Sequence, residues 1–178
     1  MSKIGIHTEH QLFLKSGNYQ SKNKDDNELI ALLDQQIKKY PKQNNVIFLH
    51  MMGSHPDACE RLFDSPRLYP QYPEAINCYL SSINKMDAFL ESVHGVLSKT
   101  GKSFSMAYFF AHGMTVNNDS YHVDNNSKAN YEVPFIVLSS DQRVREKLDK
   151  SISAYDFMNI YARACWAWKR RIWIRRGH

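Results

Sequence analysis

The run Val46-Ile47-Phe48-Leu49-His50-Met51-Met52-Gly53-Ser54-His55 decides the fold we expect, because a strongly apolar segment ends in two histidines that flank a glycine. A similar run at residues 104–113 ends in His112 and is followed by His122. Such runs predict buried strands, and ligands bind where the strands of an α/β sheet end. The sequence therefore predicts one site at these four histidines. Metal-dependent phosphoryl or sulfuryl chemistry is the first function to test.

The remaining elements alternate along the chain. Apolar residues at helical spacing predict a helix that follows Asp25-Asp26-Asn27 and ends at Pro41, and a longer helix at residues 73–101. Strands are expected at residues 45–51, 103–110 and 133–139, irregular chain at 56–72 and 115–129, and a last helix at 154–164. This order predicts an α/β fold whose mostly parallel sheet is flanked by helices. Three strands make a thin sheet, so the chain looks like part of a larger domain.

Composition limits the partners that the chain would bind. The chain has 178 residues, with 43% hydrophobic and 23% charged side chains, which is ordinary for a globular protein. Neither a membrane-spanning run nor the apolar core of a signal peptide is recognised in it. Five basic residues lie in the last ten, so residues 1–168 carry 18 basic and 18 acidic side chains. This neutral body argues against nucleic acid as a partner.

The spacing of Cys59, Cys78 and Cys165 fits no zinc ribbon and no redox pair. Cys59 and Cys78 bracket a loop rich in proline and tyrosine. In an oxidising compartment a disulfide between them would contribute about 3 kcal/mol. Two unrelated buried thiols fit the sequence equally well. Cys165 is most simply a small apolar residue.

A histidine pair such as His50 and His55 would, in isolation, favour one buried and one exposed side chain without a ligand. The second pair, His112 and His122, shifts the balance toward a site, because strands that share a sheet have their ends side by side. The other histidines have no such context, and we expect His7, His10, His94 and His178 at the surface.

Several motifs together resemble one family. They are His50-Met51-Met52-Gly53-Ser54-His55-Pro56, the long helix, His112-Gly113, His122 and residues 131–141. In this order they are similar to the phosphoethanolamine transferases, which are sulfatase-like enzymes of the alkaline-phosphatase superfamily. The sequence of residues 131–141 most resembles the branch of the family that is linked to osmoregulated periplasmic glucans. The resemblance implies that residues 1–163 are the C-terminal part of a sulfatase-like catalytic domain, an incomplete alkaline-phosphatase-like fold. Residues 164–178 would then be a basic tail rich in Trp and Arg.

The resemblance also implies a chemistry. It implies zinc-dependent transfer of phosphoethanolamine from a phospholipid, through a phospho-threonine, to a cell-envelope glycan or lipid at the periplasmic face of the inner membrane. His112 would be a ligand of the principal zinc. His55 and His122 would bind substrate phosphate or a second zinc, and His50 would line the same pocket. A periplasmic disulfide between Cys59 and Cys78 is implied as well.

Two departures from the family pattern lower the activity that we expect. Ala111 stands where the family has a zinc-binding aspartate, and we do not expect Asp124 to replace it. The segment that bears the nucleophilic threonine is not recognised, so we expect no catalytic residue and a truncated, weakly active or inactive form. One alternative is a non-catalytic remnant that binds phosphate or metal. Another is a binder of nucleic acid or of a membrane surface that uses the Trp- and Arg-rich tail; the neutral body makes this the weaker alternative.

Overall fold

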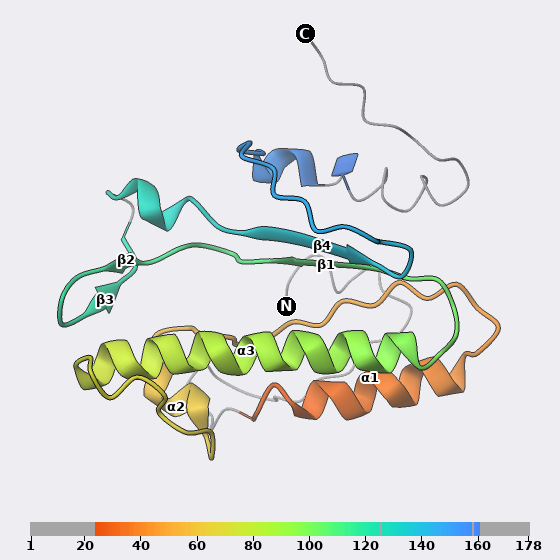
Figure 1. Ribbon diagram of the computed structural model, residues 1–178, viewed down its shortest axis with the longest axis horizontal. Coiled ribbons are helices and arrows are strands. Elements are labelled where there is room, and N and C mark those ends of the chain that lie inside the picture. The colour runs from red at the N-terminus through yellow and green to blue at the C-terminus, as the bar shows by residue number, and fades with distance from the viewer. Residues whose placement is uncertain (1–23, 125, 158, 161–178) are drawn as a thin grey trace, which may run out of the picture. The chain divides into compact units, whose positions relative to one another are not determined.

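The computed structural model describes residues 24–124, 126–157 and 159–160 (Figure 1). The chain divides into two compact units, one made of Met1–Lys102 with Phe109–Phe135 and the other of Ser103–Tyr108 with Ile136–His178. All four histidines of the predicted site belong to the first unit.

The first unit is organised around α3 (Glu74–Ser98), against which α1 (Glu28–Lys39) and α2 (Ala58–Leu62) pack (Figure 1). α3 follows Pro73, a residue whose fixed φ favours a helix start, and buries a face that includes Ile76, Met86, Phe89 and Val93. Beyond its end the chain turns at Gly101, where φ is +66°. These observations confirm the two helices that apolar spacing predicted.

Helix α2 lies within residues 56–72, so the prediction that this segment is irregular is wrong for the five residues of that helix. Ala58 and Leu62, four residues apart on one helical face, are both buried. The residues that bound the helix, Asp57 and Phe63, have φ values of 63° and 52°. Such values are unfavourable for residues with a Cβ atom and persist only where packing enforces them.

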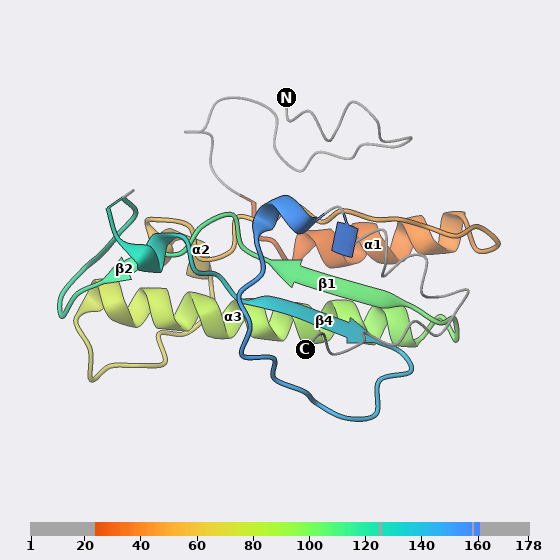
Figure 2. The ribbon, with the colours of Figure 1, turned by 90° about the horizontal axis from the view of Figure 1, so that it is seen from above.

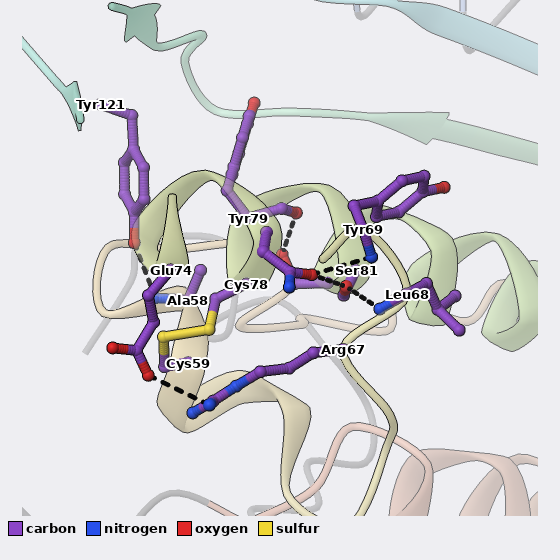
Figure 3. The surroundings of a disulfide bond; sticks show 12 residues. Ala58, Cys59, Arg67, Leu68, Tyr69, Glu74, Cys78, Tyr79, Ser81 and Tyr121 are labelled. Carbon is purple, nitrogen blue, oxygen red and sulfur yellow. Dashed lines mark hydrogen bonds and ion pairs between the residues drawn. A yellow bond between two sulfur atoms is a disulfide. The ribbon is translucent and has the colours of Figure 1, made fainter. Parts of the chain in front are cut away.

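A disulfide between Cys59 and Cys78 joins α2 to α3 (Figure 3). The two Cα atoms are 4.8 Å apart, across a sequence separation of 19. Ala58, Leu62 and Cys78 form a buried cluster beside it, with Tyr79 and Tyr121 packed on its margin. The disulfide is thus part of the small hydrophobic core between α2 and α3, which we call the disulfide corner.

The loop between α2 and α3 is held by side chains of α3 (Figure 3). The backbone N–H of Leu68 donates to Ser81 Oγ at 2.9 Å, and that of Tyr69 donates to Asn77 Oδ1 at 3.0 Å. Ser81 and Asn77 are buried and hydrogen-bonded to each other at 3.1 Å. A loop with three prolines therefore obtains its backbone partners from the helix that it precedes.

The prediction of a strand at residues 45–51 is wrong. This segment contains no strand residue, and the side chains of Val46 and Phe48 are 62% and 52% exposed. An apolar run becomes a strand only where a neighbouring strand pairs with its N–H and C=O groups. The described chain pairs β1 with β4 and β2 with β3, and neither pair includes this segment.

The strands predicted near residues 103–110 and 133–139 are confirmed as β1 (Ser105–Phe109) and β4 (Phe135–Ser139). These two strands form a two-stranded sheet, and their arrows point in opposite directions (Figure 2). β2 (Thr115–Val116) and β3 (Tyr121–His122) form an antiparallel hairpin in the first unit. Residues 115–129 are therefore not wholly irregular, and the described residues contain no parallel sheet.

The last predicted helix, at residues 154–164, starts with the 3-10 helix η3 (Ala154–Asp156). Residues 161–164 and the basic tail, residues 164–178, lie outside the described residues. Within the described ranges, no helix combines the length and the apolar character needed to cross a membrane.

Removal of the disulfide should destabilise the first unit. We expect the double variant C59S/C78S to lose about 3 kcal/mol of unfolding free energy, because closing a loop of this length restricts the unfolded chain. Urea titration followed by circular dichroism measures the loss. C165S is the matched control and should unfold at the wild-type midpoint. Equal midpoints for all three proteins without reductant would contradict a stabilising disulfide.

Candidate functional site

The turn that carries His55 is held by the carboxylate of Asp26. Asp26 Oδ1 accepts the N–H of Met52 at 3.0 Å, and Oδ2 accepts the N–H of Gly53 at 2.8 Å. Gly53 has a φ of +55°, which suits glycine, and His55 N–H donates to the Met52 carbonyl at 3.2 Å. Asp26 thus acts on the histidine turn, whereas the sequence suggested only a cap for α1.

The neighbouring carboxylate, Asp25, connects this turn to α3. Asp25 Oδ2 lies 2.7 Å from Lys85 Nζ, and the two side chains are 27% and 13% exposed. Lys85 also donates to the carbonyls of Arg61 and Leu62, at 3.0 and 3.3 Å. The start of α1, the end of α2 and the middle of α3 therefore meet at one ammonium group.

His55 and His112 lie next to each other. Their ring centroids are 6.4 Å apart, in an edge-on arrangement with an interplanar angle of 68°. His112 Nδ1 is 3.0 Å from the carbonyl oxygen of Gly113. Because a carbonyl only accepts, this contact assigns the ring proton to Nδ1 and leaves Nε2 of His112 as the acceptor in the neutral ring.

Gly113 fixes the position of His112 by packing against the 3-10 helix η2 (Lys128–Asn130). The Gly113 N–H donates to the Asn130 carbonyl at 2.9 Å. A Cβ atom at Gly113 would lie 2.0 Å from the carbonyl oxygen of Ala129, and 2.9 Å from that of Glu132. Only glycine allows so close an approach of two backbone segments.

His122 is paired with Asp124. His122 Nε2 lies 2.9 Å from Asp124 Oδ2. Asp124 Oδ1 accepts the backbone N–H groups of Asn126 and Ser127, at 2.9 and 3.1 Å, and the amide of Asn130 at 3.0 Å. The hydrogen bond from Asn126 N–H, followed by those from Ser127 and His122, lowers the pKa of Asp124. The carboxylate is therefore the stable form.

The hairpin that bears His122 is anchored at the disulfide corner (Figure 3). The Tyr121 hydroxyl accepts the N–H of Ala58 at 2.8 Å, and the Tyr121 ring stacks on Tyr79 with a centroid distance of 5.1 Å. Burial, with a smaller contribution from Tyr121, raises the pKa of Tyr79. Since Tyr121 immediately precedes His122, the corner also determines where that histidine lies.

Three of the four predicted histidines are thus linked. His55 contacts His112, and the segments of His112 and His122 both bind Asn130, which is buried. His50 and Ala111 are exposed. Asn130 and Asp26 were not predicted, because their partners are distant in the sequence. Asp124 had a local signal, since residues two apart at a strand end point the same way.

The residues that the structure describes contain no group of three His, Cys, Asp or Glu side chains placed to hold a metal ion. The zinc ligands expected from the resemblance, namely His55, His112 and His122, therefore stay a prediction.

The chain belongs to the sulfatase family, whose model matches residues 5–163. Phosphoethanolamine transferase OpgE of Escherichia coli is 32% identical over 168 residues, which are 91% of this chain and 32% of that protein. A Haemophilus influenzae protein named "Putative phosphoethanolamine transferase" is 35% identical over 125 residues, 64% of this chain and 26% of that one. No solved structure matches the chain.

These similarities confirm the resemblance to phosphoethanolamine transferases that the histidine motifs suggested. The chain spans 32% or less of the length of these two relatives.

Neutralising Asp26 should loosen the histidine turn. In D26N the amide nitrogen would face a backbone N–H, so we expect a loss of about 1–3 kcal/mol and faster hydrogen exchange at Met52 and Gly53. D34N removes the same charge from an exposed pair with Lys38 and should cost less than about 0.5 kcal/mol. Equal effects of the two substitutions would show that Asp26 does not hold the turn.

Adding a methyl group at Gly113 should displace His112. We expect G113A to destabilise the first unit by about 1–3 kcal/mol, because the new Cβ would overlap backbone atoms that cannot rotate away. G95A is the control, since nothing lies within 4 Å of its new Cβ atom and alanine favours a helix. Thermal unfolding measures both variants. A stable G113A with an unchanged His112 resonance would contradict the close packing.

Proposed function

We propose that this chain is the substrate-binding, C-terminal part of a phosphoethanolamine transferase-like protein, in which His55, His112 and His122 bind the phosphoethanolamine group. The contact between His55 and His112 carries the proposal. These residues lie on opposite sides of α3 in the sequence, and the fold brings their rings together. The names of the relatives support the choice of substrate class.

Imidazole side chains suit such a group because each neutral ring offers one N–H donor and one nitrogen lone pair. In His112 the lone pair is at Nε2, because Nδ1 faces the Gly113 carbonyl. In the whole protein the donor would be a phospholipid and the acceptor a glycan or lipid of the cell envelope, at the periplasmic face of the inner membrane.

Zinc belongs to the proposal for the whole protein. A zinc site takes three or four protein ligands, and the described residues supply no group of three. Alanine at position 111 adds none. The described residues therefore do not by themselves fit a zinc site, and no step is assigned to the metal. For the same reason we propose that the chain alone is weakly active or inactive.

A non-catalytic module that binds phosphate or metal is the second candidate, and the same pair of imidazoles favours it. A third possibility, binding of a membrane surface by residues 164–178, concerns residues outside those described. It predicts salt-dependent binding to anionic vesicles that disappears when these residues are deleted.

Calorimetry with phosphoethanolamine tests the proposal on the 178-residue chain. We expect saturable binding that H55A and H112A each weaken about tenfold or more, because each removes one polar contact to a charged ligand. H94A is the control, since His94 is an exposed residue of α3. The absence of saturable heat in the wild type would reject the binding role.

Turnover tests the proposed inactivity of the isolated chain. We expect little or no hydrolysis of a phosphodiester substrate with zinc added to the wild-type chain. Zinc-dependent turnover that H55A abolishes would instead show that the chain alone is an active enzyme, and would overturn the proposal of inactivity.

A further inference from the structure

The pair formed by His122 and Asp124 is more constrained than a surface ion pair usually is. Asp124 Oδ2 faces His122 Nε2 at 2.9 Å, while three other donors occupy Oδ1. The two oxygens of this carboxylate thus have different partners, and the carboxylate cannot rotate without breaking several hydrogen bonds.

A closed ring of contacts holds this pair in place. Thr115 is paired with His122 across the hairpin, and Asn130 Nδ2 donates to Thr115 Oγ1 at 2.8 Å and to Asp124 Oδ1 at 3.0 Å. Asn130 is 4% exposed, so its amide depends on these two acceptors. The hairpin therefore holds the backbone of His122 and Asp124 holds its ring, although 45% of the His122 side chain is exposed.

An ionised carboxylate only accepts hydrogen bonds. The contact with Asp124 therefore assigns the proton of the neutral His122 ring to Nε2 and makes Nδ1 the acceptor. His112 has the opposite arrangement, because its Nδ1 faces a carbonyl. In the neutral rings the acceptor nitrogen is therefore Nδ1 in His122 and Nε2 in His112.

We infer that Asp124 is a positioning residue that makes Nδ1 of His122 the atom that meets the substrate, and that this atom accepts a hydrogen bond from the ammonium end of phosphoethanolamine. A lone pair attracts an ammonium N–H and repels a phosphate oxygen, which also carries lone pairs. This inference rests on the binding role proposed above for His122.

The variant D124N tests the role of Asp124 and keeps the hydrogen bonds that hold the loop. Asn Oδ1 can keep the three hydrogen bonds from Asn126, Ser127 and Asn130, which places its NH₂ group opposite His122 Nε2. Nε2 must then accept, so the ring proton moves to Nδ1. D119N is the matched control, because it removes the same charge from an exposed position of the same hairpin.

Long-range ¹H–¹⁵N spectra of the ¹⁵N-labelled chain report which ring nitrogen carries the proton. At about pH 8 we expect the Nε2–H form of His122 in the wild type and D119N, and the Nδ1–H form in D124N. A wild-type ring protonated at Nδ1, or a D124N ring that keeps the wild-type form, would overturn the role of Asp124.

Titration with three ligands at the same pH tests the substrate half of the inference. We expect D124N to weaken binding of phosphoethanolamine and ethanolamine about tenfold, the size of one hydrogen bond to a charged group, and not to weaken inorganic phosphate. Loss of phosphate binding alone would overturn the contact with the ammonium group. If the wild type shows the expected ring proton but His122 responds to none of the ligands, the binding role of His122 is rejected while the positioning by Asp124 stands.

Discussion

One ammonium group, that of Lys85, joins three segments of the first unit. It lies 2.7 Å from the Asp25 carboxylate and donates to the last carbonyls of α2, so α3 holds the start of α1 and the end of α2. The lysine side chain is 13% exposed, and a charge so enclosed is costly when it loses its partner. Asp26 follows Asp25 directly and binds the turn before His55. The position of that turn therefore depends on the Lys85 contact.

A second set of contacts connects α3 to the hairpin that bears His122. The disulfide fixes α2 against α3, and the N–H of Ala58, at the start of α2, binds the hydroxyl of Tyr121. His122 is the next residue along the hairpin. The same long helix thus positions His55 through carboxylates and His122 through a disulfide and an aromatic stack.

The histidines meet by a different mechanism from the one that the apolar runs suggested. Strand ends at the edge of one parallel sheet would place side chains together by geometry alone. Here the contacts are polar and involve the backbone: Asp26 binds two N–H groups of one turn, and Asn130 binds the segments of His112 and His122. Gly113 permits the close approach that this requires. Such a site is held by individual hydrogen bonds, so single polar substitutions should matter as much as changes in the core.

The sequence by itself determined α1, α3, β1 and β4, and also the sulfatase family and the histidines that form the candidate site. These follow from apolar spacing and short motifs, which are local properties of the chain. The tertiary structure alone decided that residues 45–51 are not a strand, because strand pairing depends on neighbours that a pattern does not reveal. It also decided which polar residues position the histidines. Asp26 accepts hydrogen bonds from Met52 and Gly53, which lie 26 and 27 residues further along the chain. Nothing in the local sequence distinguishes Asp26 from an ordinary helix cap. Contacts of this kind exist only once α3 has brought the segments together.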